Sequence, residues 1–183
     1  MKKIIVASMA LLSVSLFTPA FAADPGAYVL VDLGVLTYTE VSDYSNPGKV
    51  GIGAGYNLSP NFGAELIYHL IGNSVHAGTT GNTTLKTSSI VAAVVGNLPI
   101  SNSFGVFAKL GASSNQSTLD ISAFGATTSK SDSKTDIYYA AGAKFNVTKS
   151  VDLYLEYESF GAYQSSSNPS KGSATTLGLT FGF

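Results

Sequence analysis

The stretch Phe104-Gly-Val-Phe-Ala-Lys-Leu-Gly111 has an apolar side chain at every second place, starting from Phe104. The places between them hold two glycines, Phe107 and Lys109. A period of two is that of a β-strand, because successive side chains of a strand point to opposite faces of its sheet. The segment therefore predicts a strand with one apolar face and one face of mostly small or polar residues.

The same period recurs along the chain, and no stretch after Ala22 repeats at helical spacing over a useful length. Two segments fit less cleanly, since 29–39 is only partly alternating and 85–98 is apolar on both faces. We expect eight strands, at 29–39, 50–57, 62–70, 85–98, 104–111, 137–145, 151–157 and 177–183.

The connections between these strands alternate in length. Short turns are expected at 58–61, 99–103 and 147–150, and longer loops rich in Ser, Thr, Asn and Gly at 40–47, 72–84, 114–134 and 161–172. Consecutive hairpins with all short turns at one end form an antiparallel meander, and closing the meander removes its free edges. The predicted fold is all-β, an eight-stranded antiparallel up-and-down barrel.

Composition excludes several classes of protein. The 183 residues include no Cys, which excludes disulfide scaffolds and zinc knuckles. The ten basic residues are all Lys and the net charge is −1, so no basic stripe for nucleic acid is expected. His69 and His76 lack the spacing of a metal site, and Tyr56 interrupts the only phosphate-loop-like glycine pattern, so no cofactor is expected.

The N-terminus predicts export. Two lysines precede the apolar run Ile4–Phe17, and the small-residue pattern Ala20-Phe21-Ala22 follows it. This order is typical of a signal peptide cut after residue 22, which leaves 23–183 as a single barrel domain. The alternative, a membrane-spanning helix, is disfavoured because the run is shorter than the roughly 20 apolar residues that cross a bilayer.

A period of two does not by itself tell whether the apolar face points into a core, as in lipocalins, or outward into lipid. The non-apolar faces are rich in Gly, Ala, Ser and Thr, which suits the narrow inside of an eight-stranded barrel. The strands are about ten residues long, as a tilted membrane strand requires. Aromatic residues also gather near the strand ends, as in interfacial girdles: Tyr56, Phe62, Phe104, Phe145 and Phe183 beside the short turns, and Tyr38, Tyr68, Tyr139 and Tyr157 towards the long loops. We therefore predict a transmembrane barrel.

Three segments, 55–66, 151–157 and the Phe-terminated last strand, resemble the eight-stranded membrane domain of the outer-membrane protein A (OmpA) family. The resemblance implies a Gram-negative outer membrane, with lipid and lipopolysaccharide around the barrel and both termini in the periplasm. It also implies that the barrel-assembly machinery recognises the last strand. Nothing follows Phe183, so the peptidoglycan-binding domain of longer members and its cell-wall tether are not expected. The assembly signal is expected at Leu177, Leu179, Phe181 and Phe183.

If the apolar faces meet lipid, His69 and five charged residues point into the lumen. Each charged residue lies at a similar distance from the short-turn end of its strand, which predicts one layer of ion pairs that plugs the lumen. Planar bilayer conductance is then expected to rise in the Lys109→Ala variant. Lumen ion pairs are the rule in the resembled family, although Tyr154 and Lys144 stand where an Arg and an acid are expected. The predicted network consists of Asp32, Glu65, Lys109, Lys144 and Glu156.

The predicted function is that of a non-catalytic barrel with a structural or adhesive role, whose surface loops meet a host or surface ligand. The Ser/Thr-rich loop 114–134 is either an adhesive tip or a solvated connection. A narrow ion-conducting pore is one alternative. A lipid A-modifying enzyme is another, although no His-x-Ser pair exists and His69 has inward parity.

Overall fold

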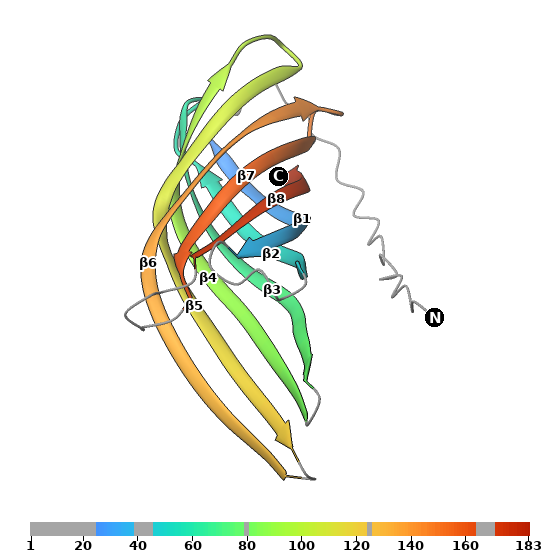
Figure 1. The fold of residues 1–183 in the computed structure, drawn as a ribbon. Helices are drawn as coiled ribbons and strands as arrows, with labels where there is room; N and C mark the ends of the chain where they lie inside the picture. The colour runs from blue at the N-terminus through green and yellow to red at the C-terminus, as the bar shows by residue number, and fades with distance from the viewer. Residues whose placement is uncertain (1–24, 39–45, 79–80, 124–125, 164–170) are drawn as a thin grey trace.

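The computed structural model describes residues 25–38, 46–78, 81–123, 126–163 and 171–183. Each strand pairs in antiparallel fashion with the next, and the last strand pairs with the first (Figure 1). The result is a closed eight-stranded barrel, which confirms the predicted fold class. The strands are β1 (Gly26–Tyr38), β2 (Gly48–Asn57), β3 (Phe62–Gly78), β4 (Gly81–Pro99), β5 (Phe104–Ala123), β6 (Ala126–Asn146), β7 (Val151–Ala162) and β8 (Lys171–Gly182).

Three short turns connect neighbouring strands at one end of the described barrel, where they were predicted. Their geometry follows from hydroxyl side chains that accept hydrogen bonds from nearby backbone amides, as turn-forming Ser and Thr commonly do. Ser59 Oγ accepts from the Phe62 amide at 3.1 Å, and Ser101 Oγ accepts from the Phe104 amide at 3.1 Å. The backbone amide of Phe183 donates to Ala27 at 3.0 Å, so β1 begins and β8 ends at this same end.

At the opposite end, two of the predicted loops are strands. The β3–β4 ladder continues to the pair Gly78 and Gly81, and the β5–β6 ladder continues to Ala123 and Ala126. The expectation of loops over 72–84 and 114–134 was wrong, because Ser and Thr at alternate places support a strand as well as a loop. His76, expected in a loop, lies in β3. Strands β4, β5 and β6 extend well past β1 and β8 (Figure 1). Residues 39–45 and 164–170 of the other two loops lie outside the described ranges.

The barrel is inverted relative to a soluble one, because large apolar side chains are exposed over the outer wall, whereas most of the strands' charged side chains are buried inside among aromatic and aliphatic ones. Ile52 and Val94 on the outer wall are 61% and 62% exposed, whereas Lys109 and Glu156 are 5% and 2% exposed. This arrangement is the one that hydrocarbon favours and water opposes. The prediction of a transmembrane barrel is therefore confirmed.

In the described residues, no helix is long and apolar enough to cross a bilayer.

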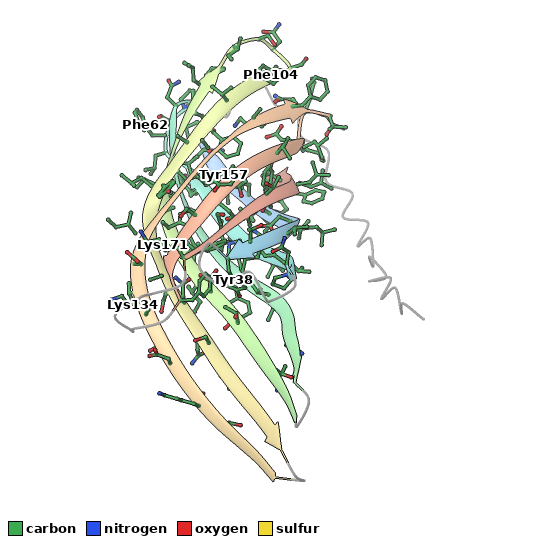
Figure 2. All side chains as sticks on the ribbon, in the orientation of Figure 1. Tyr38, Phe62, Phe104, Lys134, Tyr157 and Lys171 are labelled. Carbon is green, nitrogen blue, oxygen red and sulfur yellow. The ribbon has the colours of Figure 1, made fainter. Side chains whose placement is uncertain are left out.

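The aromatic girdles follow the prediction with one exception. Phe62, Phe104 and Tyr157 are exposed on the outer wall (Figure 2). Tyr38, expected in the outer girdle, is instead buried, and its hydroxyl lies 3.2 Å from Thr87 Oγ1. Tyr38 and the inward-pointing Asp32 are separated by an even number of residues in β1, so their side chains lie on the same face of the strand. The Tyr38 side chain therefore points into the lumen.

Candidate functional site

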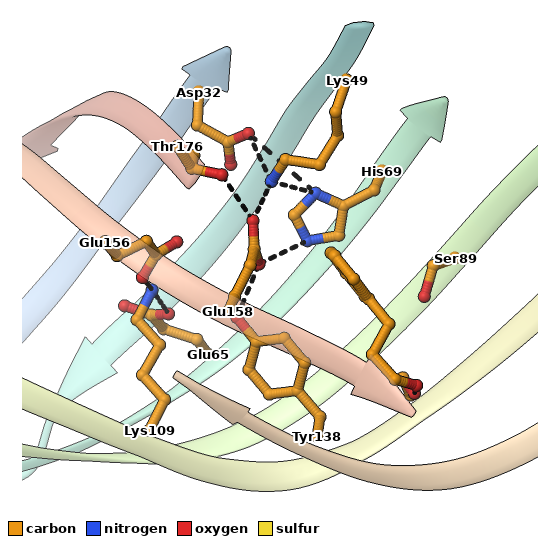
Figure 3. Close-up of polar contacts among 12 residues, drawn as sticks. Asp32, Lys49, Glu65, His69, Ser89, Lys109, Tyr138, Glu156, Glu158 and Thr176 are labelled. Carbon is orange, nitrogen blue, oxygen red and sulfur yellow. Dashed lines mark hydrogen bonds and ion pairs between the residues drawn. The ribbon is translucent and has the colours of Figure 1, made fainter. Parts of the chain in front are cut away.

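Among the described residues, two groups of buried ion pairs lie in the lumen. The first, the Lys109 cluster, joins Lys109 of β5, Glu65 of β3 and Glu156 of β7 (Figure 3). Lys109 Nζ lies 2.8 Å from Glu65 Oε2 and 2.9 Å from Glu156 Oε2. The Tyr28 hydroxyl donates to Glu65 Oε1 at 2.7 Å. Three strands that are distant in sequence are thereby tied together across the inside of the barrel.

The second group, the Lys49 cluster, consists of Lys49, Asp32, Glu158 and His69 (Figure 3). Lys49 Nζ lies 3.0 Å from Asp32 Oδ1 and 3.0 Å from His69 Nδ1, and it also pairs with Glu158 Oε1. Two hydroxyls donate to Glu158, that of Tyr138 at 2.8 Å and that of Thr176 at 2.6 Å. Each member of this cluster is at most 3% exposed.

Ion pairing and hydrogen bonding offset the free-energy cost of burying these charged side chains. An ion taken out of water without a partner costs several kcal/mol, and paired ions recover that cost only with good geometry and further hydrogen bonds. The carboxylates of the two clusters outnumber their ammonium groups, and the hydroxyls of Tyr28, Tyr138 and Thr176 supply additional donors. The inward-pointing polar residues of the two clusters thus form ion pairs and hydrogen bonds with one another rather than with water.

Above the Lys49 cluster, the end of β7 turns into the barrel. The β6–β7 ladder stops at Tyr139 and Ser159, and the β7–β8 register shifts between Ser159 and Gly161. Gly161 has φ +67°, and a Cβ there would come within 2.7 Å of the Asp136 side chain, so glycine is required on both counts. We call residues 160–163 the Phe160 segment; Phe160, Ala162 and Tyr163 in it are buried.

Polar side chains of β5 hold the Phe160 segment in place. Asn115 Nδ2 donates to the carbonyl oxygens of Phe160 at 2.7 Å and Ala162 at 2.9 Å. Ser113 Oγ donates to the same Phe160 oxygen at 2.5 Å, and Ser117 Oγ donates to Tyr163 at 3.3 Å. Since β6 lies between β5 and β7 in the sheet, these bonds show that the segment crosses the inner face of the wall.

Phe160 covers the Lys49 cluster directly. Its ring centroid is 5.1 Å from that of His69 and 5.6 Å from that of Tyr138, and Lys49 Nζ lies 5.6 Å from the Phe160 centroid. Asp136 accepts hydrogen bonds from the amides of Ala162 and Ile137, so this side chain of β6 also holds the Phe160 segment. The lumen is therefore filled at three successive levels.

The short-turn end of the lumen is open. A cavity of about 1000 Å³ begins at the turns and reaches Glu65, Lys109 and Tyr154 of the barrel interior. We call this cavity the vestibule. Lys144 lines it and donates a hydrogen bond to Asn97 Oδ1 at 3.0 Å. The vestibule thus ends at the Lys109 cluster.

The structure distributes the five charged residues predicted for one layer over three places. Glu65, Lys109 and Glu156 meet in the Lys109 cluster, Asp32 belongs to the Lys49 cluster, and Lys144 lies in the vestibule. The single layer is thus replaced by separate levels, because the strands of a closed barrel are tilted and staggered. Equal distance from a strand end does not give equal height in the lumen.

Sequence reasoning missed Lys49, Glu158 and Phe160 among the residues that fill the lumen. Lys49 has the inward parity of the glycines that follow it, but it precedes the predicted start of its strand. Glu158 and Phe160 continue the parity of Glu156, but they follow the predicted end of theirs. Carrying the period of two past the apolar residues would have found all of them.

The predicted assembly residues lie on the outer wall of β8. Leu177 and Phe183 are exposed, and Leu179 and Phe181 are half-buried. Within the described ranges, no group of three or more His, Asp or Glu side chains is arranged so that it could hold a metal ion.

Solved structures share this fold. Ail, the attachment invasion locus protein of Yersinia pestis, has 20% identity and a TM-score of 0.60, with 88% of this chain and 100% of that chain covered. Neisserial surface protein A has 17% identity and a TM-score of 0.67, with 86% and 97% covered. The N-terminal barrel of Pseudomonas aeruginosa OprF has 14% identity and a TM-score of 0.54, with 87% and 100% covered. Another Ail structure is a complex with the heparin analogue sucrose octasulfate.

Among curated proteins, no sequence matches the chain at a significant level. The family model described as "Outer membrane protein beta-barrel domain" matches residues 5–183, which includes every described strand. The predicted resemblance to small outer-membrane barrels is confirmed, and the chain belongs to the outer-membrane protein β-barrel family.

Proposed function

We propose that this protein is a sealed, non-catalytic scaffold of the outer membrane that holds strand extensions outside the cell for surface contact. One observation carries the proposal: the lumen is filled at three levels, while β3, β4, β5 and β6 continue past the membrane wall. Export through a signal peptide over 1–22 and a surrounding layer of lipid and lipopolysaccharide belong to the same proposal.

The filled lumen argues against a conducting pore. The Lys109 cluster, the Lys49 cluster and the Phe160 segment lie in series, so an ion would have to pass all three. The Lys109→Ala substitution, expected from the sequence to raise conductance, leaves two of these levels intact. A measurement of stability therefore tests the role of Lys109 more directly than conductance does.

The position of the buried histidine argues against lipid-modifying chemistry. Such chemistry requires a base and a nucleophile within hydrogen-bond reach of each other at the lipid-facing wall. His69 is fully buried in the lumen, with Lys49 Nζ at its Nδ1 and the Phe160 ring beside it. A lipid on the outer wall does not reach this imidazole.

The strand extensions support surface contact. On β5 and β6 they present exposed Ser and Thr side chains, including Ser131, whose hydroxyl lies 3.1 Å from that of Thr118. The Ail complex with a heparin analogue is consistent with ligand binding by barrels of this shape. In this chain the absence of Arg and the excess of acids favour a partner other than a polyanion.

The contact function is tested by shortening one extension. Because Thr118 pairs with Ser131, residues 119–130 can be replaced by a two-residue Asn-Gly turn that leaves Ser117 and its hydrogen bond to Tyr163 in place. The shortened barrel is expected to reach the outer membrane and to keep its heat-modifiable mobility on unboiled gels. Attachment of expressing cells to surfaces and to one another is expected to fall severalfold. Unchanged attachment would contradict the proposal.

The last strand is proposed as the signal read by the barrel-assembly machinery. The Phe183→Ser substitution removes an exposed ring at the very end of the outer wall, so little packing inside the barrel is lost. We expect severalfold less barrel in the outer membrane of cells, but unchanged refolding of the purified chain in detergent. Equal losses in both measurements would indicate a stability effect and count against the signal.

A further inference from the structure

The vestibule contains two opposite charges that do not pair with each other. Lys144 of β6 and Asp152 of β7 both line it, and both are half-buried. Lys144 Nζ donates to Asn97 Oδ1 at 3.0 Å, and Asp152 Oδ2 accepts from the Thr180 hydroxyl at 3.2 Å. Among the contacts of the described residues, neither side chain forms an ion pair. Because an ammonium group has three donors and a carboxylate about four acceptor sites, most of their hydrogen-bonding capacity remains.

The strand register places these two side chains next to each other on the inner face. Lys144 pairs with Tyr154 across the β6–β7 ladder, and Asp152 lies two residues before Tyr154 in β7. Diagonal neighbours of this kind have Cα atoms about 7–8 Å apart. The pair is therefore suited to a small ligand that carries an anionic group and a cationic group close together, with the anion at Lys144 and the cation at Asp152.

Apolar side chains line the deep part of the vestibule. Val95, Phe107 and Tyr154 form one buried apolar cluster, and all three line the cavity. The rings of Phe107 and Tyr154 flank Lys109, whose Nζ lies 5.2 Å and 5.3 Å from their centroids. A few polar groups beside an apolar surface are typical of small-molecule sites, in which the polar groups fix the orientation of the ligand. The apolar cluster thus offers a place for an apolar part of the same ligand.

The vestibule is closed at its inner end. Its volume of about 1000 Å³ is large enough for a small molecule, and the Lys109 cluster and the Lys49 cluster fill the lumen beyond it. A ligand that enters at the short-turn end therefore leaves by the same route. The geometry supports binding and not passage through the barrel.

We propose that the vestibule binds zwitterionic α-amino acids that have an apolar side chain. The α-carboxylate accepts hydrogen bonds from Lys144, the α-ammonium group donates to Asp152, and the side chain packs against Val95, Phe107 and Tyr154. A ligand with one charge leaves either Lys144 or Asp152 without an ionic partner. This inference goes beyond the contact function, which concerns the opposite end of the barrel, and does not depend on it.

Ligands that carry only one of the two charges test the proposal on the unaltered protein. Equilibrium dialysis measures binding of radiolabelled L-leucine to the full barrel refolded in detergent micelles, with empty micelles as the blank. 4-Methylpentanoate keeps the carboxylate and the apolar group of leucine, and 3-methylbutylamine keeps the ammonium and the apolar group. We expect saturable binding of leucine. Each analogue is expected to compete at least roughly tenfold less well, because each lacks one charge-assisted hydrogen-bonding group.

Two substitutions test the role of each charged residue. Lys144→Met is expected to weaken leucine binding roughly tenfold and to leave binding of 3-methylbutylamine unchanged. Asp152→Asn is expected to weaken leucine binding by a similar factor and to leave binding of 4-methylpentanoate unchanged. Lys134→Met alters the net charge as Lys144→Met does, but Lys134 does not line the vestibule, so this control is expected to bind leucine like the wild type. Heat-modifiable mobility on unboiled gels shows whether each variant is folded.

Three results would overturn the proposal. The first is the absence of saturable leucine binding to the wild type. The second is equal affinity for leucine and both analogues, which would mean that the apolar surface alone binds the ligand. The third is leucine binding that neither Lys144→Met nor Asp152→Asn weakens. The barrel with the shortened hairpin is expected to bind leucine like the wild type, so failure of the contact function and failure of this site are distinguishable.

Discussion

Replacement of Lys109 by Met is expected to lower the free energy of unfolding by about 3–5 kcal/mol, as removal of one partner from a buried ion pair does. Lys109 Nζ lies within 2.9 Å of carboxylate oxygens from both Glu65 and Glu156, and all three side chains are almost inaccessible to water. Without the ammonium group, two acids remain buried side by side. Urea unfolding of the barrel in vesicles, followed by mobility on unboiled gels, measures the loss.

The control is the other lysine of the short-turn half of the lumen. Lys144 lines the open vestibule and donates one hydrogen bond, to Asn97, so Lys144→Met is expected to cost about 1 kcal/mol or less. Adding Glu156→Gln to Lys109→Met removes one uncompensated acid and is expected to recover part of the loss. Equal losses for both lysines, or no recovery in the double variant, would show that the ion pairs do not act as inferred.

Phe160→Ala is expected to lower the free energy of unfolding by about 3–5 kcal/mol, as loss of a buried aromatic ring does. The Phe160 ring contacts His69, Tyr138 and Tyr163, and it lies over Lys49 Nζ. Its removal leaves a cavity above the Lys49 cluster that the hydrogen-bonded backbone of the segment is too constrained to fill. The same urea experiment measures the effect.

A thiol reporter distinguishes opening of the lumen from a general loss of stability. Ser89 is buried and donates to Asn115, which holds the Phe160 segment. In a Ser89→Cys background we expect no labelling by a water-soluble maleimide applied from outside. Labelling is expected once Phe160→Ala is added. Leu155→Ala, on the exposed outer wall of the same strand, is the matched control. Labelling in that control as well would mean that Phe160 does not close the lumen.

The alternation of side chains along each strand predicted most of the charged residues that point into the lumen. Asp32, Glu65 and Lys109 were assigned to the lumen because they alternate with apolar residues, and all three are buried there. The same rule, carried one residue beyond the predicted strand ends, gives Lys49 and Glu158. Parity also contradicts the placement of Tyr38 in a girdle, so that error came from weighing residue type above position.

The heights of these residues were not predictable in the same way. Which carboxylate meets which lysine depends on the stagger between strands, and stagger is fixed by closure of the whole sheet. Glu156 and Glu158 are two residues apart in β7, yet one meets Lys109 and the other meets Lys49. Similarly, the Ser/Thr-rich segments 72–84 and 114–134 are compatible by composition with either a loop or a strand. They form strands because a neighbouring strand supplies hydrogen-bond partners for their backbone.

The sequence by itself determined the period of two, the short turns and the division of each strand into a lipid face and a lumen face, because these depend on residues adjacent along the chain. Only the tertiary structure decided the separate ion clusters and the inward turn of residues 160–163. Each of these depends on contacts between strands far apart in sequence, whose positions are set when the barrel closes.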